Sequence, residues 1–296
     1  MSTAPDSREV GRFLAARRAQ LTPREVGLPD AGERRRVAGL RRTEVAQLAT
    51  ISVEYYTRLE QGRVQASAAV LSTLARALRL DEDQQTYLYE LAHKSDARPH
   101  RRRAPEQVRP EVRRLLEQLT ETPALVLGRR LDILGWNAAA TALYLDFEQI
   151  PRARRNYVHL MFSEPQFRRL HRRWEHDARV AIGAIRMAAA GEPDDPELAR
   201  LVGELSVRDK DFRTWWAEHR VDSSSFGTKS YRHPLVGDLT LDCDTWSSPD
   251  GSGQRLMILS AEPGTASHDA LRILTSWVAS EPQGDPEAES EGSRHQ

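Results

Sequence analysis

The pattern of apolar residues between Leu40 and Arg63 predicts two short helices joined by a tight turn. Apolar side chains fall on one face of each helix, at Val45, Leu48 and Ala49 and then at Val53, Tyr56 and Leu59. The Ser52 hydroxyl can cap the second helix by accepting a hydrogen bond from its first turn. The outward face carries polar and charged groups on Glu54, Tyr55, Arg58, Gln61 and Arg63. A short helix of this kind suits the major groove of DNA.

Three further helices flank this pair. We expect one from about Arg8 to Gln20, one opening at Ser67, and one opening at Asp81 with Gln84 completing a capping box. Together they predict a mainly α domain of five helices over residues 8–93, the outer helices closing the core over the central pair. The loop of residues 21–39 carries the run Arg34–Arg36, which lies either on a DNA backbone or in solvent.

Residues 94–107 are hydrophilic, contain two prolines, and are interpreted as an interdomain linker. After them the pattern alternates between helical and strand periods. We expect helices at 110–121, 137–146, 153–162, 165–190, 196–205, 209–220 and 267–279, and strands at 124–127, 131–136, 227–233, 235–245 and 255–260. Two strands, a block of helices and three more strands predict an α+β domain over residues 108–280. Its helices would pack on one central antiparallel sheet, in the order of a PAS-like sensor domain.

Charge is balanced over the chain, with 43 basic and 43 acidic residues, but it is unevenly placed. Residues 8–63 hold twelve arginines and seven acids, whereas residues 281–296 hold five acids and one arginine and are expected to be a disordered acidic tail. Cys243 is the only cysteine, which fits a reducing cytoplasm. No apolar run is long enough to span a membrane, so we expect a cytoplasmic, nucleoid-associated protein.

The segment from Leu40 to Arg63 resembles the helix-turn-helix of the phage-repressor, or xenobiotic-response-element (XRE), class of bacterial transcription regulators. The resemblance rests on Val45-Ala46, Thr50-Ile51-Ser52 and Leu59-Glu60-Gln61-Gly62-Arg63. Thr50 stands where the class usually has glycine, so we expect the turn to adopt a geometry that a β-branched residue tolerates. Arg41-Arg42 stand where Thr-Gln is usual, which favours phosphate pairing by arginine.

This resemblance implies a division of labour on double-stranded DNA. Val53, Glu54 and Arg58 match the base-reading positions. The positions expected at the DNA backbone or groove edge are Arg42, Ser52, Tyr55, Gln61 and Arg63. Proteins of this class bind two-fold operators as homodimers, so the same is expected here.

The C-terminal half resembles the MmyB-like ligand-binding domain, found behind such helix-turn-helix modules in actinobacterial regulators. The resemblance rests on Leu134-Gly135-Trp136-Asn137, on residues 170–174 (LHRRW), on residues 231–237 (YRHPLVG) and on Glu262-Pro263-Gly264. It implies a PAS-like pocket for a small apolar, fatty-acid-like ligand. The aromatic and histidine side chains considered for that pocket are Trp136, Trp174, Trp215, Trp216, His219 and His233.

The sequence points away from catalysis and cofactors. It has no Gly-x-Ser-x-Gly elbow, phosphate-cradling loop or dinucleotide fingerprint. His171 and Glu175, one helical turn apart, suggest a metal pair, but Arg172 and Arg173 between them disfavour a cation. We therefore predict a ligand-responsive DNA-binding regulator that is not an enzyme. The alternatives are a protein-interaction module of the antitoxin kind and an enzyme with a DNA-docking domain.

Overall fold

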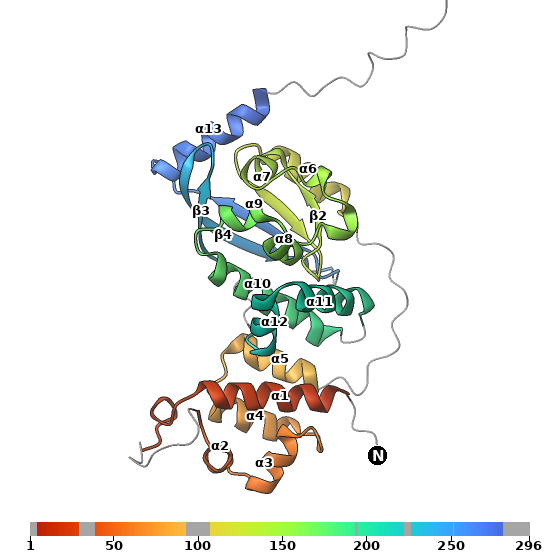
Figure 1. Ribbon diagram of the computed structural model, residues 1–296, viewed down its shortest axis with the longest axis vertical. Coiled ribbons are helices and arrows are strands. Elements are labelled where there is room, and N and C mark those ends of the chain that lie inside the picture. The colour runs from red at the N-terminus through yellow and green to blue at the C-terminus, as the bar shows by residue number, and fades with distance from the viewer. Residues whose placement is uncertain are drawn as a thin grey trace, which may run out of the picture.

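The computed structural model describes residues 5–29, 39–92, 107–192, 195–221, 226–250 and 252–280. A bundle of N-terminal helices lies at one end of the molecule and an antiparallel sheet lies toward the other, with α10, α11 and α12 between them (Figure 1). The expected linker, except for Gln107, and the acidic tail lie outside the described residues, as does the run Arg34–Arg36.

The N-terminal part is helical, as predicted. Its elements are α1 (Pro5–Gln20), a 3₁₀ turn η1 (Arg24–Val26), α2 (Arg42–Leu48), α3 (Val53–Glu60), α4 (Ala68–Ala77) and α5 (Glu82–Ala92). The expected caps are present: the Ser52 hydroxyl accepts from Tyr55 N at 3.1 Å, and Asp81 and Gln84 bond reciprocally. Apolar side chains at most 2% exposed form its core, among them Phe13, Leu14, Tyr56, Leu74 and Leu88.

Helices α2, α3 and α4 all end in the same way. In each, the residue after the C-cap has a left-handed backbone, at Thr50 (φ 55°), Gly62 (φ 66°) and Arg79 (φ 47°). The next amide then bonds back across the last turn, as from Ile51 N to Ala46 O at 3.0 Å. This is the Schellman arrangement, which glycine adopts without strain and threonine does not. The expectation that this turn adopts a geometry suited to a β-branched residue is therefore wrong: the turn between α2 and α3 keeps the left-handed residue and holds Thr50 there at an energetic cost.

The C-terminal part contains five antiparallel strands in the order β2-β1-β5-β4-β3. They are β1 (Ala124–Leu127), β2 (Ile133–Trp136), β3 (Phe226–His233), β4 (Gly237–Ser247) and β5 (Arg255–Ser260). Representative pairs are Leu125 with Trp136, Val126 with Leu256, and Cys243 with Leu259. The α+β fold with a central antiparallel sheet is thus confirmed.

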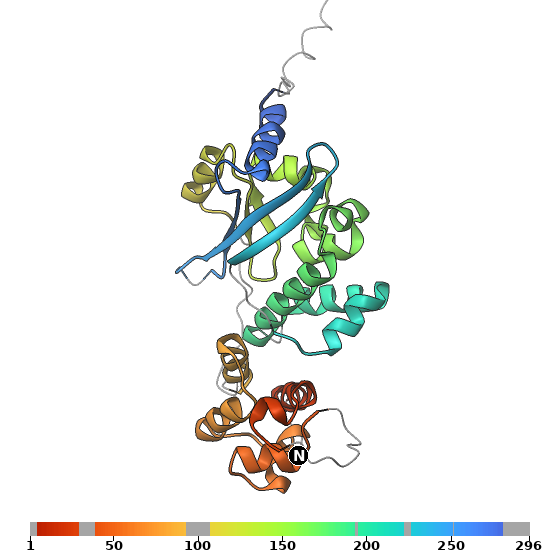
Figure 2. The ribbon, with the colours of Figure 1, turned by 90° about the vertical axis from the view of Figure 1, so that its left-hand side faces the viewer.

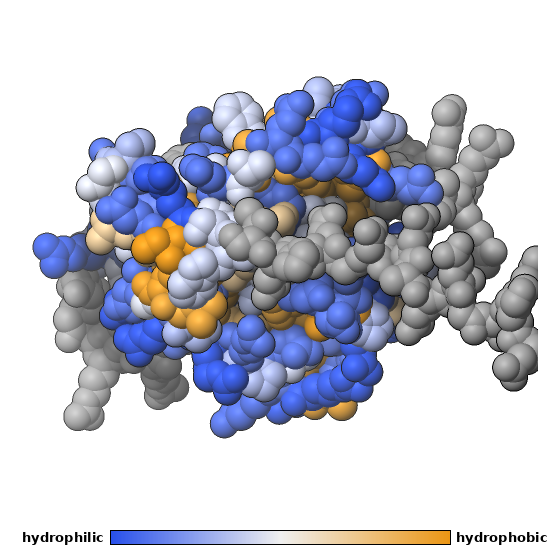
Figure 3. Space-filling model, turned by 90° about the horizontal axis from the view of Figure 1, so that it is seen from above, coloured by the Kyte–Doolittle hydropathy of each residue, from blue (hydrophilic) through white to orange (hydrophobic). Residues whose placement is uncertain are grey.

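Helices cover both faces of this sheet. They are α6 (Pro110–Gln118), α7 (Ala138–Leu143), α8 (Tyr157–Ser163), α9 (Pro165–Leu170), α10 (Trp174–Gly191), α11 (Pro196–Arg208), α12 (Lys210–Ala217) and α13 (Ala266–Ser280), with 3₁₀ turns η3 (Phe147–Gln149) and η4 (Arg152–Arg154). Leu116 of α6 packs with Val126 on one face, and the main core lies on the other. Seen from above, this end of the molecule shows a patch of apolar residues among hydrophilic ones (Figure 3). Ile273 and Trp277 of α13 are half exposed.

The prediction of one long helix over residues 165–190 is wrong. The chain leaves the helix at His171, which forms an isolated bridge with Tyr231 of β3, and Arg172 N donates to Ser230 O at 2.9 Å. Bonding to the sheet edge takes these backbone groups away from a continuous helix, so α9 ends and α10 begins again at Trp174. The helix expected at 153–162 is likewise the turn η4 followed by α8.

The opposite edge of the sheet, at β2, is bonded in a similar way. Asp132 pairs with Asn156 in an isolated bridge, and Ile133 N donates to Arg155 O at 2.7 Å. No helix among the described residues is long and apolar enough to cross a membrane.

Candidate nucleic-acid interface and effector cleft

Helix α3 buries one face and exposes the other. Tyr56 and Leu59 are at most 1% exposed and anchor the helix in the bundle core. Glu54 and Arg58 are exposed on the outward side, and Val53 is half-buried. The three residues predicted to read bases therefore lie on one element, with the polar pair accessible to a groove.

The residues predicted at the DNA backbone surround this helix. Ser52 is exposed at its N-terminus, where its hydroxyl is engaged as the cap. Tyr55 is half-buried and its hydroxyl donates to Gln65 O at 3.4 Å. Gln61 and Arg63 are exposed just beyond the C-terminal end. The predicted positions thus lie at the two ends of α3 and, in the case of Tyr55, on the helix itself.

Arg42 lies beside the same helix, but in an ion pair that the sequence did not indicate. Its Nε donates to Glu60 at 2.7 Å, and Arg18 Nε of α1 donates to the same carboxylate at 2.6 Å. Glu60 is 2% exposed at its side chain. Burial alone would raise the pKa of Glu60, but the two guanidinium groups outweigh it and hold that pKa below its usual range. Glu60 therefore stays ionised and ties α1, α2 and α3 together.

Two glycines let α1 cross the end of α3 at close range. A Cβ on Gly11 would lie 2.7 Å from the Glu60 carbonyl carbon, and one on Gly62 would lie 2.7 Å from Arg8 Cα. Both distances are below any that real Cβ atoms show, so only glycine fits at this crossing. Glu60 and Gly62 belong to the helix-turn-helix motif seen in the sequence, whereas no local pattern pointed to Gly11 or Arg18.

The six side chains considered for a ligand pocket do not line one site, although the Trp174 and Trp215 rings are in contact, with centroids 5.4 Å apart. Trp215 is 8% exposed in the core, and Trp174 donates to Met161 O at 2.8 Å beneath the Arg168 guanidinium. His233 bonds Ala142 O at 3.1 Å, a structural contact. Trp216 and His219 lie instead at the junction with the N-terminal helices, against Arg186.

The interior of the C-terminal part is filled by aromatic rings. The Tyr144 and Tyr231 hydroxyls are 2.8 Å apart, and His171 donates from Nδ1 to Phe167 O at 2.8 Å while Tyr157 lies 3.3 Å from its Nε2. Burial lowers the pKa of His171 to about 3, so the ring is neutral and Nε2 accepts. His171 is therefore fixed in the core, and no group of three or more metal-ligating side chains is found among the described residues.

Trp136, the sixth residue, faces a surface cleft of about 540 Å³ between the start of α6, strand β2, turn η4 and α11. Val108, Leu134 and Leu201 line its apolar side. Two exposed arginines, Arg113 and Arg152, line it as well, and neither has an ion-pair partner among the described residues.

Other arginines of the cleft are already engaged. Arg155 lies over the Trp136 ring at 5.2 Å and donates to Ile150 O, and Arg130 pairs with Asp132 and Asp195. A cleft with an apolar wall and two free guanidinium groups suits an amphipathic anion.

Comparison with known protein families gives two matches. The model of the MmyB-like transcription regulator ligand binding domain matches residues 108–274, and that of a helix-turn-helix domain matches residues 9–88. No curated protein was found to match the chain.

Proposed function

The chain belongs to the family of MmyB-like transcription regulators and carries a helix-turn-helix domain, and from this premise we propose that it binds a specific two-fold operator as a homodimer under the control of a small ligand. The observation that carries the proposal is the exposure of Glu54 and Arg58 on a helix whose other face is buried. In Figures 1 and 2, α3 lies at the end of the molecule away from the sheet, so a duplex can approach it without meeting the C-terminal part.

In this proposal α3 enters the major groove. Arg58 donates bidentately to a guanine edge, Glu54 accepts from a base amino group, and Val53 packs on a thymine methyl. Arg63, Gln61 and Arg42 contact phosphate or the groove edge and fix the register of the protein on the duplex. One chain supplies one such helix, so a second copy is needed to read the other half-site.

Selection from a random duplex library tests the roles of the two arginines. Arg58→Ala should relax the base preference at one position of each half-site, a loss of about 1–3 kcal/mol of discrimination. Arg63→Ala should weaken all duplexes alike and reduce the slope of log affinity against log salt by about one. Arg169→Ala, which removes an exposed arginine of α9, is the matched control and should change neither. An unaltered sequence preference in Arg58→Ala would remove the base-reading role from this residue.

For the ligand we propose an organic acid with an apolar body, such as a fatty acid, bound in the cleft beside Trp136. Its carboxylate would pair with Arg113 and Arg152, and its chain would lie on Val108 and Leu134. The cleft begins where the linker ends, because Gln107 lines it and accepts at its carbonyl from Gln254. A ligand there would touch the segment that joins the two parts of the chain.

Native mass spectrometry of the purified protein tests dimer and ligand together. A dimer that releases a discrete organic acid on denaturation is the expected result. Added fatty acid should change the tryptophan fluorescence of the wild type but not that of Trp136→Phe, which keeps the other five tryptophans. The corresponding alcohol should change neither, since only the acid can pair with the arginines. A combined Arg113→Ala and Arg152→Ala variant should abolish the difference between acid and alcohol, and Arg169→Ala should keep it. Equal binding of the two compounds by the wild type would place the ligand elsewhere.

A further inference from the structure

Arg186 of α10 is buried at the junction between the C-terminal part and the N-terminal helices. Its side chain is 1% exposed, its guanidinium lies 4.1 Å from the Trp216 ring centre, and it donates to Trp216 O. It also donates from Nη1 to His219 Nδ1 at 3.2 Å. Burial and the Arg186 charge lower the pKa of His219 to about 4, so at neutral pH this ring is uncharged and accepts.

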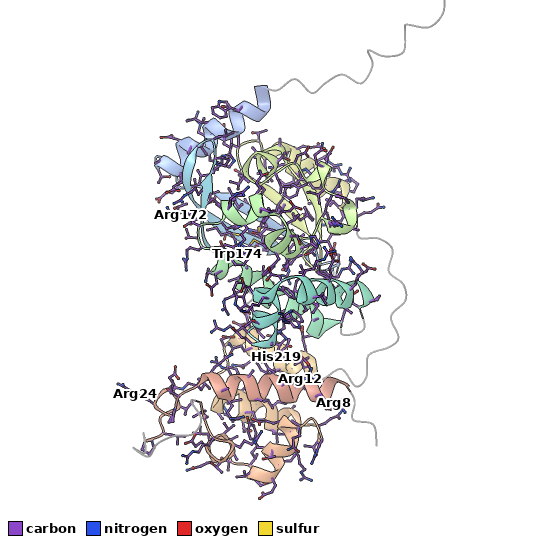
Figure 4. The ribbon with its side chains drawn as sticks, viewed as in Figure 1. Arg8, Arg12, Arg24, Arg172, Trp174 and His219 are labelled. Atoms are coloured by element: carbon purple, nitrogen blue, oxygen red, sulfur yellow. The ribbon has the colours of Figure 1, made fainter. Side chains whose placement is uncertain are left out.

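The negative charge that faces this guanidinium comes from the other part of the chain. Glu9 of α1 lies 3.8 Å from Arg186 Nη1 and 3.4 Å from His219 Nδ1. The Arg186 Nε has no hydrogen-bond partner among the described residues. A buried charge without a counterion is costly, so contact between α1 and α10 stabilises Arg186 where it lies. In Figure 4, His219 lies directly beside α1, near Arg12.

Apolar packing joins the same elements. Ala190 at the end of α10 and Val221 are at most 7% exposed and belong to the core of the N-terminal helices, with Phe13 and Tyr87. Ile185, one residue before Arg186, belongs to the core against the sheet. Helix α10 therefore enters both cores, and Figure 2 shows it running from the sheet to the N-terminal bundle.

Helix α1 continues this contact to the recognition helix. On the side of α10 it carries Glu9, which lies beside Arg186. On the side of α3 it carries Gly11, whose missing side chain lets the backbones of the two helices meet, and Arg18, which pairs with Glu60. A movement of α10 that displaces Glu9 therefore displaces the helix on which the end of α3 rests.

We propose that α1 transmits the position of the C-terminal part to the DNA-reading helix, and that the pair of Glu9 with Arg186 is the contact that sets it. Arg186 is then a positioning residue for DNA binding, acting through Glu9 and α1. This inference rests on the proposed function for its DNA readout, but its structural part stands on the contacts alone. When the pair is broken, α1 no longer follows α10, and the C-terminal end of α3 loses part of its support.

Glu9→Gln in the full-length protein tests the inference, because it removes the charge at a half-exposed position and keeps the side-chain volume. The matched control is Glu82→Gln, which removes an exposed carboxylate of α5 that has no ion pair among the described residues. Hydrogen exchange is measured in α1, in the second half of α10 and across Leu59–Arg63. Affinity is measured for the duplex selected by the wild type and for an unrelated duplex.

In Glu9→Gln, amide hydrogen exchange should be about tenfold or more faster than in the wild type in α1 and in the second half of α10, and it should also be faster at Leu59–Arg63. Affinity for the selected duplex should change by about threefold or more while affinity for the unrelated duplex stays the same. Glu82→Gln should leave all of these values at wild type. Glu9→Asp, which restores the charge on a shorter side chain, should recover part of the protection.

Two outcomes would overturn the inference. In one, exchange rises at the junction while Leu59–Arg63 and the affinity stay unchanged, which makes the pair a structural anchor only. In the other, nothing changes at the junction, which means that the pair does not hold α1. If the wild type selects no duplex at all, the proposed function fails, and the exchange at Leu59–Arg63 still decides whether α1 links α10 to α3.

Discussion

Replacing Gly11 by alanine sets two known effects against each other. Alanine favours a helix over glycine by about 0.5–1 kcal/mol, so the substitution would stabilise an open helical site. At Gly11, however, the new Cβ would lie 2.7 Å from the Glu60 carbonyl carbon and 2.8 Å from Leu59 O. Both neighbours are backbone atoms at the end of α3, so no side chain can turn aside. Helices α1 and α3 would have to separate by more than 0.7 Å, because 0.7 Å brings only the Glu60 carbonyl carbon to the 3.4 Å of ordinary contact and the Glu60 carbonyl oxygen lies closer still.

Forced overpacking of this kind costs about 1–3 kcal/mol, which exceeds the gain in helix propensity. Because the neighbours are backbone atoms, we take the upper part of that range, about 2–3 kcal/mol; subtracting the propensity gain of about 0.5–1 kcal/mol, we expect Gly11→Ala to lower the free energy of unfolding by about 1–2.5 kcal/mol. The matched control is Gly203→Ala in α11, where an added Cβ would meet nothing within 4 Å. This variant should gain about 0.5–1 kcal/mol.

Urea unfolding followed by far-UV circular dichroism measures both variants against the wild type. If Gly11→Ala proved as stable as the wild type while Gly203→Ala gained stability, α1 would not cross α3 at the distance described. If Gly203→Ala also lost stability, the assumed propensity gain would be wrong and the comparison would decide nothing about the crossing.

Three further predictions concern single positions. Thr50→Asn should raise the free energy of unfolding by about 0.5–1 kcal/mol, and with it the urea midpoint, because asparagine tolerates the left-handed backbone better than threonine. A lower midpoint would argue against that backbone. Glu60→Gln should destabilise the protein by about 1–3 kcal/mol at neutral pH, where the ionised carboxylate of the wild type holds Arg18. The difference from the wild type should shrink as pH falls through the lowered pKa of Glu60, because the wild-type carboxylate is then protonated. A difference that does not vary with pH would contradict the ion pair. His171 has a pKa of about 3 in the folded protein against an ordinary 6.5, so between these pH values its ring binds fewer protons in the folded state than in the unfolded state. Stability should therefore fall as pH drops through this window, and the fall should be shallower in His171→Gln. An equal slope in the two proteins would mean that the ring is not buried in its neutral form.

The sequence was sufficient where neighbouring residues determine the structure. The apolar stripe of α3 and its Ser52 cap depend on side chains a few positions apart, and both were predicted. The left-handed backbone at Thr50 was not predicted, because the side-chain type favoured a turn that a β-branched residue tolerates. Short apolar runs also located β1, before the hairpin signal Gly128-Arg129-Arg130, and β5 with their bounds.

The sequence was insufficient where distant segments meet. Nothing near Arg186 indicates that its counterion is Glu9, and nothing near Gly11 indicates the backbone of Glu60. The apolar period of residues 165–190 runs from Leu170 to Trp174 without a break, so the sequence gives no sign that the helix stops at His171. Only the strand β3, far along the chain, interrupts the helix. Aromatic residues were grouped as a pocket because of their type, whereas their contacts distribute them over the core, the junction and the cleft.

The sheet also limits how two copies of this chain can associate. Its outer strands, β2 and β3, are the places where a sheet usually accepts a further strand, and here the backbone at Arg155 and at His171–Arg172 already bonds to them. A dimer built by joining two sheets edge to edge would first have to displace these segments. Self-association is therefore expected to use helical surfaces, since each edge is occupied at its bridge and cannot accept a further strand along its whole length.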